Sequence, residues 1–390
     1  MKTEFLNTYL EKLERDGLKR HLKELSGPQG AHVILDGKQV VNFCSNNYLG
    51  LASDKRLLQA AANSLAQEGM GSGASRLVCG NLKRHRALEK KIAAFKGTED
   101  CLVFSTGYMA NVGIISSLCE RGDIILSDKL NHASIVDGIR LSRAEFRRYP
   151  HKNMNALEEE LKKAEHFQER FIVTDSVFSM DGDIAPLDKI VELAQKYKAF
   201  VMVDEAHSFG VLGKNGKGAV EHFGLQDKID IQMGTLSKAA GSFGAYCCGS
   251  KNLVDFLINK ARSFIYTTGM PACVAAASLK AVEIIEKEPQ RRQDLLDNAH
   301  NVRQAFQEVG FDILQSQTPI IPVVVSETSK AVEFSKQLFE KNIFVQAIRP
   351  PTVPENTARL RVTVMATHNQ EDIAKLLSAF EEIGKKLCLI

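Results

Sequence analysis

The sequence predicts an α/β protein in which a large domain, built on a mostly parallel sheet covered by helices, precedes a smaller α+β domain. The first observation is that short β-rich runs alternate with helical stretches from about residue 99, as in parallel sheets wrapped by helices. The runs lie at residues 101–104, 124–126, 171–173, 200–203 and 229–231. The second observation is a change of pattern after a long helical region at about 271–309. There the order becomes a strand at 320–325, a helix at 328–341, a strand at 358–364 and a final helix.

The length of the chain supports more than one core. A chain of 390 residues exceeds what a single compact core usually spans. We expect an N-terminal helix and small strand segment at 1–45, a large ligand-binding domain at 46–285 and an α+β domain at 286–390. The apolar spacing within residues 5–24 predicts an amphipathic helix that packs on the body of the protein or on a partner subunit.

The composition argues against several classes of function. Its 44% hydrophobic and 25% charged residues are typical of an ordinary folded protein. Because 50 basic and 47 acidic side chains are mixed throughout, the net charge of +3 gives no field suited to nucleic acid, and we expect no such partner. The eight cysteines form no C-x-x-C pair, so we expect no metal. The start lacks an apolar leader and no run of about 18 apolar residues occurs, so we expect a cytoplasmic protein with no membrane partner.

Polar segments follow five of the predicted strands. In open α/β sheets, ligands bind beyond the carboxyl ends of the strands, so these segments are expected to meet at one edge. The first of them is a small polar turn that opens a helix at Gly107, whose free N–H groups would suit a phosphate. The five segments are 105–111, 127–134, 174–182, 204–207 and 234–238.

The residue types in these segments suit a cofactor with a protonated ring. Lys238 ends a Gly-Thr-Leu-Ser-Lys run, where desolvation would prepare its amine for imine formation. Asp204 would keep a ring nitrogen protonated, His207 would steady a phenolic oxygen, and His132 would stack on the ring. Taken singly, a lysine is usually a surface charge and a lone histidine is usually structural. Their shared placement at strand ends favours a functional site.

Seven segments carry a resemblance to a known family. They are 42–50 (NFCSNNYLG), 71–76 (GSGASR), 131–134 (NHAS), 181–182 (DG), 204–207 (DEAH), 235–238 (TLSK) and 359–361 (RLR). On these segments, and over almost its whole length, the chain resembles the α-oxoamine synthase family of fold-type I pyridoxal-phosphate enzymes. The resemblance implies an aspartate aminotransferase-like large domain with a seven-stranded, mostly parallel sheet, and pyridoxal 5'-phosphate as cofactor.

The resemblance also implies a role for each matching residue. The catalytic residues would be Lys238, which carries the cofactor, His132 on the ring face, Asp204 at the pyridine nitrogen and His207 at the phenolic oxygen, which Ser179 would also contact. The cofactor phosphate would be held by Thr106, Gly107, Tyr108 and Thr235, and by Thr267 or Thr268 of the partner subunit. The active site would therefore lie at the interface of a homodimer.

The resemblance implies decarboxylative condensation of an amino acid with an acyl thioester. Arg361 would grip the substrate α-carboxylate bidentately, Asn46 would assist, and His132 would polarise the acyl oxygen. Two substrate pairs fit. The segments 348–354, 75–78 and 264–268 are similar to the member that joins L-alanine to a pimeloyl thioester, on CoA or an acyl carrier protein, giving 8-amino-7-oxononanoate for biotin synthesis. The segments 42–50, 135–138 and 383–387 also resemble the member that uses glycine and acetyl-CoA.

We favour the pimeloyl reaction, because the distal end of a pimeloyl chain needs a polar partner that acetyl does not need. Arg349 and Thr352 would supply that partner. The substrate-contacting arginine that the family has near its N-terminus aligns with Lys19 or Arg20.

Rival interpretations come from other classes of protein. The Asp-Glu-Ala-His run at 204–207 spells a helicase motif, but the chain has no G-x-x-x-x-G-K-[ST] phosphate loop. The glycines at 69–73 lack the G-x-G-x-x-G spacing and follow a helix-like stretch, which argues against dinucleotide binding. A non-catalytic subunit with this fold is the remaining alternative. The joint presence of Lys238, His132 and Asp204 argues against it.

Overall fold

The computed structural model describes residues 3–16 and 18–390. The chain divides into two compact units. The large unit comprises Asn47–Ser179 and Asp183–Leu295, and the small unit comprises Met1–Asn46, Met180–Gly182 and Leu296–Ile390.

These units differ from the three expected domains at 1–45, 46–285 and 286–390. The N-terminal strands belong to the small unit because β3 (Lys38–Asn42) pairs in parallel with β12 (Ile343–Phe344). The second boundary falls inside the helix α12 (Pro289–Glu308), which begins in the large unit and continues into the small one. A third difference is Met180–Gly182, three residues that leave the large unit and return to it.

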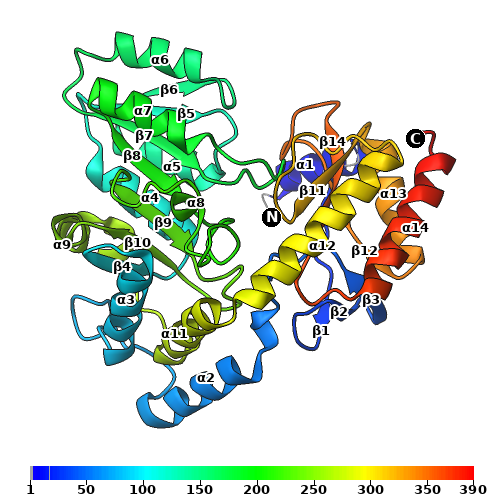
Figure 1. Ribbon diagram of the computed structural model, residues 1–390, viewed down its shortest axis with the longest axis horizontal. Helices are drawn as coiled ribbons and strands as arrows, with labels where there is room; N and C mark the ends of the chain where they lie inside the picture. The colour runs from blue at the N-terminus through cyan, green and yellow to red at the C-terminus, as the bar shows by residue number, and fades with distance from the viewer. Residues whose placement is uncertain (1–2, 17) are drawn as a thin grey trace. The chain divides into compact units, whose positions relative to one another are not determined.

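The large unit is built on a seven-stranded sheet in the order β4-β10-β9-β8-β7-β5-β6 (Figure 1). Its strands are β4 (Asp100–Phe104), β5 (Ile124–Asp128), β6 (Glu145–Tyr149), β7 (Arg170–Asp175), β8 (Phe200–Asp204), β9 (Ile231–Thr235) and β10 (Ala245–Gly249). Strand β10 runs antiparallel to both of its neighbours, β4 and β9, and the other six strands run in one direction. The predicted seven-stranded, mostly parallel sheet is thereby confirmed.

Two of the seven strands gave no clear signal in the sequence. The edge strand β6 reads EFRRY, in which charged residues dominate, and β10 reads AYCCG, which has no β-branched residue. Both are strands because of their position in the sheet, since β6 pairs with β5, and β10 lies between β4 and β9. Tertiary context overrides weak β-propensity here.

Helices accompany the sheet of the large unit. They are η1 (Leu51–Ser53), α2 (Lys55–Glu68), α3 (Lys83–Lys96), α4 (Gly107–Leu118), α5 (Ala133–Ser142), α6 (Met154–Lys163), α7 (Leu187–Tyr197), α8 (Ala219–His222), α9 (Lys251–Lys260), α10 (Arg262–Ile265) and α11 (Ala272–Lys287). Ile114 and Ile115 of α4 and Ile135 and Ile139 of α5 are buried in one apolar cluster with side chains of the sheet. This burial fixes the start of both helices next to the carboxyl ends of the strands.

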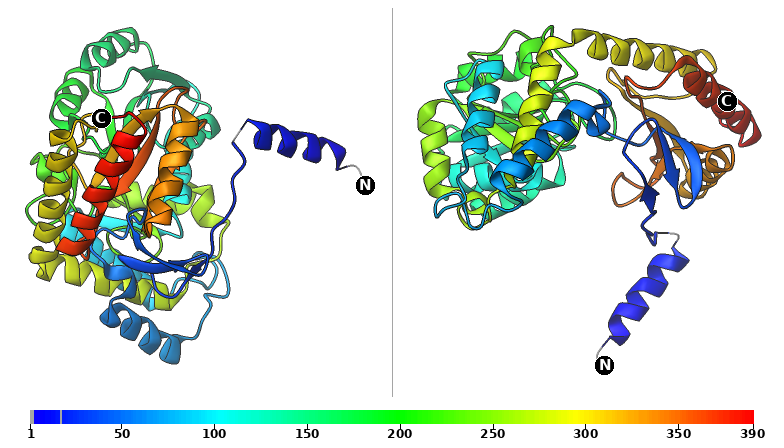
Figure 2. Two further views of the ribbon diagram at one scale, coloured as in Figure 1. Left: turned by 90° about the vertical axis from the view of Figure 1, so that its right-hand side faces the viewer. Right: turned by 90° about the horizontal axis from the view of Figure 1, so that it is seen from below.

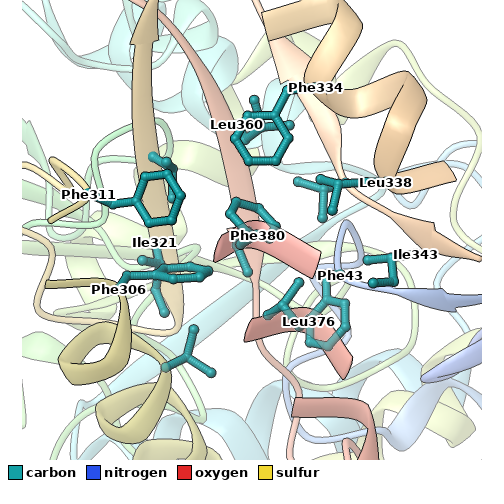
Figure 3. Packing of buried hydrophobic residues seen from close by; sticks show 14 of the residues in the cluster. Phe43, Phe306, Phe311, Ile321, Phe334, Leu338, Ile343, Leu360, Leu376 and Phe380 are labelled. Carbon is teal, nitrogen blue, oxygen red and sulfur yellow. The ribbon is translucent and has the colours of Figure 1, made fainter. Parts of the chain in front are cut away.

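The small unit contains two sheets and its own core. The sheets are β1 (Leu25–Ser26), β2 (His32–Leu35), β3 and β12 in that order, and β11 (Ile320–Ser326), β14 (Ala358–Thr363) and β13 (Gln346–Ile348) in that order. Helices α13 (Thr328–Glu340), α14 (Gln370–Lys386) and part of α12 complete it. Phe380 lies 4.7 Å from Phe306 and 4.9 Å from Phe334 between ring centroids, within the core that Figure 3 shows. The predicted α+β pattern of this region is confirmed.

The N-terminal helix is shorter than predicted. Helix α1 spans Glu4–Arg15, whereas the apolar spacing predicted a helix over residues 5–24. Asp16 is the C-cap residue, and its N–H donates to the Lys12 carbonyl at 2.9 Å. None of the residues of α1 is buried, and Figure 2 shows it extending away from the strands β1–β3 of its unit.

Within the described parts of the chain, none of the helices is long and apolar enough to span a lipid bilayer.

Candidate active site

All five predicted segments supply residues that line one cavity in the large unit. The cavity has a volume of about 190 Å³ and lies beyond the carboxyl ends of the parallel strands. It is lined by Gly107, Tyr108, Asn111, His132, Ser134, Asp175, Ser179, Asp204, Ala206, His207, Met233, Thr235, Ser237 and Lys238. The segment after β4 contributes Gly107, Tyr108 and Asn111 from the start of α4. The predicted convergence at one edge of the sheet is what the structure shows.

One end of the cavity is formed by the start of α4. Thr106 is the N-cap residue, and its hydroxyl accepts a hydrogen bond from the Met109 N–H at 3.1 Å. Thr106 therefore shapes this turn and does not itself line the cavity, whereas Gly107 and Tyr108 do. Across from them, the hydroxyls of Thr235 and Ser237 lie 2.7 Å apart. Free N–H groups at a helix start, together with hydroxyls, form a site suited to a phosphate.

Asp204 ends β8 and is only 4% exposed. Its Oδ2 accepts a hydrogen bond from Nδ2 of Asn111 at 2.8 Å, and its Oδ1 accepts one from the Ala206 N–H at 2.8 Å. A buried carboxylate needs such donors because its water has been removed. The two donors hold it in one orientation at the wall of the cavity.

His207 follows the same strand and is held by an aromatic partner. Nδ1 of His207 lies 2.6 Å from Oη of Tyr48, which is 1% exposed. The two rings meet edge to face, with centroids 6.1 Å apart. This contact fixes the ring plane of His207, whose side chain borders the cavity.

His132 caps the start of α5. Its Nδ1 accepts a hydrogen bond from the Ser134 N–H at 3.2 Å and lies 2.7 Å from the Ser134 hydroxyl. The His132 residue is exposed by area, but enough water is excluded from its ring to lower its pKa, an effect opposed by the charge of Asp204. The ring is therefore neutral at physiological pH.

Asp175 lies beside His132 at the end of β7. Its Oδ2 accepts a hydrogen bond from the His132 N–H at 2.7 Å. Burial, and the nearby charge of Asp204, raise the pKa of Asp175 well above its usual range. Two carboxyl groups, those of Asp175 and Asp204, therefore line this cavity. Asp175 is the one disposed to hold a proton.

Lys238 and Ser179 complete the cavity from two turns. Lys238 is half-buried in the turn after β9, where the Gly241 N–H donates to the Lys238 carbonyl at 2.9 Å. Ser179 is half-buried in the loop after β7. Both predicted residues thus reach the same cavity as Asp204 and His132.

Thr267 and Thr268 lie elsewhere in the large unit. With Arg76 and His85 they line a separate small cleft, where Thr268 forms an isolated bridge with Ser75. Their expected contact with a phosphate in the partner subunit stays a prediction.

Arg361 lies in the small unit, on the central strand β14. Its Nη1 donates to the Thr363 hydroxyl at 2.9 Å and its Nη2 to Oδ1 of Asn46 at 3.2 Å. The structure thus brings together the two residues that were predicted to hold the substrate carboxylate. Arg359, two residues earlier and on the same face of the strand, forms an ion pair with Asp181.

The other predicted substrate residues meet in a second cavity of the small unit, of about 720 Å³, which we call the basic pocket. Arg20 donates from Nη2 to the Thr352 hydroxyl at 3.1 Å, and Arg349 donates from Nη2 to the Lys19 carbonyl at 2.9 Å. The Lys19 side chain pairs with Glu14. The pocket is lined by Lys19, Arg20, His21, Leu22, Lys23, Val332, Ser335, Phe344, Gln346, Ala347, Ile348, Arg349 and Thr352.

Several side chains that line the cavity or contact its lining residues were given no role by the sequence interpretation. Tyr48 and Ser134 lie inside the matching segments 42–50 and 131–134, so a signal existed for them, and Asp175 and Ser237 lie inside the polar segments 174–182 and 234–238. Asn111 ends the polar segment 105–111 and lies one turn inside α4, where nothing in the sequence marks it as a hydrogen-bond donor to Asp204. The remaining missed residues are Ala206 and Met233.

Comparison with known proteins agrees with this geometry. Residues 38–380 match the family model of aminotransferase class I and II. An 8-amino-7-oxononanoate synthase from Citrifermentans bemidjiense is 51% identical over 383 residues, which cover 98% of each chain.

Two solved structures have the same fold. The serine palmitoyltransferase SPT with a PLP internal aldimine superposes with a TM-score of 0.95 at 30% identity, covering 100% of this chain and 99% of that one. The 8-amino-7-oxononanoate synthase from Francisella tularensis gives 0.78 at 31% identity, covering 89% and 98%. The chain belongs to the aminotransferase class I and II family and, within it, to the α-oxoamine synthases.

Proposed function

We propose that this chain is a pyridoxal-phosphate-dependent acyltransferase that condenses L-alanine with a pimeloyl thioester, releasing 8-amino-7-oxononanoate, carbon dioxide and the free thiol. The observation that carries the proposal is full-length identity of about half with relatives of that activity, combined with a cavity whose side chains suit the cofactor. The reaction belongs to biotin synthesis.

The residues of the cavity fit pyridoxal phosphate. The carboxylate of Asp204 is buried and has two donors, so a protonated ring nitrogen would be a suitable third partner. Gly107, Tyr108 and Thr235 would hold the phosphate at the start of α4, and Lys238 would carry the cofactor covalently. Ser179 and His207 would contact the phenolic oxygen, and His132 would cover the ring face. In a homodimer, Thr267 or Thr268 of the partner subunit would add a phosphate contact.

The bound cofactor supplies an electron sink that weakens the bonds at the amino-acid Cα. Lys238 takes the Cα proton and returns one to the same carbon after the carboxylate has left. His132 donates a hydrogen bond to the acyl oxygen as negative charge develops there. Asp204 would accept a hydrogen bond from the protonated pyridine nitrogen and so favour its protonated form.

The small unit supplies the groups that select the substrates. Arg361 and Asn46 would bind the carboxylate of the amino acid, because a buried guanidinium forms two parallel hydrogen bonds to it. The basic pocket would receive the acyl chain, with Arg20, Arg349 and Thr352 facing its polar distal end. Lys19 is turned toward Glu14, so we assign the N-terminal substrate contact to Arg20.

The proposal is tested by mass spectrometry of products formed by the purified protein with pyridoxal phosphate. The donors are pimeloyl-CoA and a pimeloyl-acyl carrier protein, each with L-alanine, and acetyl-CoA with glycine. We expect 8-amino-7-oxononanoate from L-alanine and at least one pimeloyl donor. Product formed only from glycine and acetyl-CoA would show that these are the substrates in place of the proposed pair. No product from any pair would indicate a non-catalytic subunit.

We expect the protein to act in the cytoplasm.

A further inference from the structure

A chain of hydrogen bonds joins the two ring-contacting groups of the cavity, Asp204 and His132. Oδ2 of Asp204 accepts from Nδ2 of Asn111 at 2.8 Å, and the same nitrogen donates to Oγ of Ser134 at 2.9 Å. Oγ of Ser134 lies 2.7 Å from Nδ1 of His132. The four residues come from β8, α4 and α5, so the chain ties three elements together at the cavity wall.

The direction of the last hydrogen bond is fixed by the backbone. The Ser134 N–H also points at Nδ1 of His132, at 3.2 Å, and a backbone N–H can only donate. Nδ1 is therefore an acceptor and carries no proton. The Ser134 hydroxyl consequently donates to Nδ1, and its oxygen accepts from Asn111.

The orientation of the Asn111 amide is fixed as well. Both protons of Nδ2 are used, one on the Asp204 carboxylate and one on the Ser134 oxygen. Rotating the amide by 180° would place Oδ1 against a carboxylate and against a hydroxyl oxygen whose proton is committed to His132. Asn111 is 1% exposed, so water does not compensate for such a loss. Its Oδ1 has no hydrogen-bond partner among the described residues, which shows that the amide is oriented by its donors.

We propose that Asn111 and Ser134 are positioning residues that hold His132 as the neutral tautomer with its proton on Nε2, and hold Asp204 ready for the cofactor ring. His132 then meets the ring face and the acyl oxygen as a hydrogen-bond donor. The catalytic part of this inference rests on the proposed function, whereas the tautomer itself does not. Removal of water from the ring lowers the pKa of His132, which agrees with a neutral form.

The tautomer is tested by ¹⁵N nuclear magnetic resonance of the full chain labelled at its ten histidines, both cofactor-loaded and stripped. The signals of His132 are identified by their loss in the His132→Asn variant. We expect Nδ1 to be of the unprotonated type and Nε2 of the protonated type in both forms. A proton on Nδ1, or on both nitrogens at neutral pH, would overturn the proposal.

Two variants test whether Asn111 and Ser134 maintain this state. Ser134→Ala removes the hydroxyl donor but keeps the backbone N–H, so Nδ1 should stay unprotonated while its signal shifts through the loss of one hydrogen bond. We expect a fall of about threefold to tenfold in kcat and little change in KM for the thioester. Asn111→Leu leaves the Asp204 carboxylate short of a donor and should lower cofactor affinity by about tenfold to a hundredfold. The matched control is Ser142→Ala, a buried serine of the same helix whose hydroxyl bonds to the Ile139 carbonyl at 2.6 Å.

The control should leave the His132 signals and the cofactor affinity unchanged. If Ser134→Ala and Ser142→Ala behave alike, the proposed roles of Ser134 and Asn111 are wrong. The magnetic resonance measurement needs no turnover, so an inactive wild-type protein with the expected His132 spectrum would contradict the proposed function and leave the tautomer assignment intact.

Discussion

Nε2 of His151 lies 2.9 Å from Oδ2 of Asp183, while Nδ1 of the same ring lies 3.0 Å from Oδ1 of Asp128. Asp128 begins the turn that leads to His132, and Asp183 closes the loop that carries Ser179, since its carbonyl accepts the Phe178 N–H at 3.1 Å. His151 thus joins two loops that line the cofactor cavity, although it does not reach the cavity itself.

The charge of His151 gives a prediction about pH. Burial alone would lower the pKa of His151, but hydrogen bonds to Asp128 and Asp183 outweigh it and raise the pKa to about 9. Because the folded pKa exceeds the unfolded value of about 6.5, this contribution to stability is complete below pH 6.5 and is lost as pH rises through 9. The ring is partly exposed, so we expect only about 1–2 kcal/mol. Lys152, which also pairs with Asp183, keeps part of the contact.

The measurement is the free energy of unfolding of the wild type and of His151→Gln between pH 6 and pH 10. We expect the difference between the two proteins to shrink as pH rises through 9. A difference that stays constant over that range would mean that His151 is neutral in the folded protein.

Lys238 gives a prediction about the cofactor. Lys238→Arg keeps the positive charge but has no amine able to form an imine or to exchange a proton at Cα. We expect loss of covalently bound cofactor and a fall in kcat of about a hundredfold to ten-thousandfold. Borohydride reduction followed by peptide mapping measures the first effect, with Lys260→Arg, at an exposed residue of α9, as the control. Label on any peptide other than the one with Lys238 would refute the assignment.

The sequence predicted the parts of this site that depend on single strands. Each of the polar segments that contain Lys238, Asp204 and His132 follows an apolar run. The change from a buried strand to a polar turn therefore identifies these residues from local sequence alone. Asn111 and His151 were not identified, because their roles depend on which loops the folded sheet brings next to each other. The sequence around Asn111 does not indicate that Asp204, 93 residues further on, will accept a hydrogen bond from its side chain.

The same distinction holds for the fold. The apolar runs before Asp175 and Asp204 predicted their strands correctly, because parallel strands that are buried on both faces are continuously apolar. The strand β6 lies at the edge of the sheet and β10 enters it antiparallel, so neither needed such a run. The end of α1 at Arg15 was also missed, since its apolar spacing continues to Leu18 after the helix has ended.

Arg361 and Arg359 give a prediction that separates binding from stability. Arg361→Lys replaces a planar fork with a point charge, so we expect KM for the amino acid to rise and kcat/KM to fall about a hundredfold. Arg359→Lys, two residues away on the same face of β14, weakens the pair with Asp181 and should mainly lower the midpoint of thermal unfolding. Steady-state kinetics and calorimetry of both variants distinguish the two effects. Equal KM values for the two variants would argue against a substrate role for Arg361.

The basic pocket gives a prediction about acyl specificity. Pimeloyl-CoA and heptanoyl-CoA have chains of the same length, but only the first ends in a carboxylate. We expect wild type to prefer pimeloyl-CoA, and Arg349→Gln to reduce that preference about tenfold to a hundredfold, because a hydrogen bond to a charged group is lost. The ratio of kcat/KM values for the two thioesters measures it. An unchanged ratio in Arg349→Gln would place the distal carboxylate outside the basic pocket.

Gly182 gives a prediction about the three residues that enter the small unit. Its φ is +70°, and a Cβ would lie 2.0 Å from the Ile320 carbonyl oxygen, so alanine meets both a left-handed backbone and a steric clash. We expect Gly182→Ala to lower the free energy of unfolding by about 2–5 kcal/mol, the sum of these two costs. Gly37→Ala is the matched control, because Gly37 has a φ of +78° with nothing within 4 Å.

The control carries only the backbone cost of about 1–2 kcal/mol. Chemical denaturation of both variants therefore isolates the clash as the difference between them. The Gly182 carbonyl also accepts a hydrogen bond from the Thr318 hydroxyl at 2.9 Å, so a displaced turn would weaken this contact as well. Equal losses in the two variants would mean that the turn moves away from Ile320 at no cost, and that Met180–Gly182 is not held firmly in the small unit.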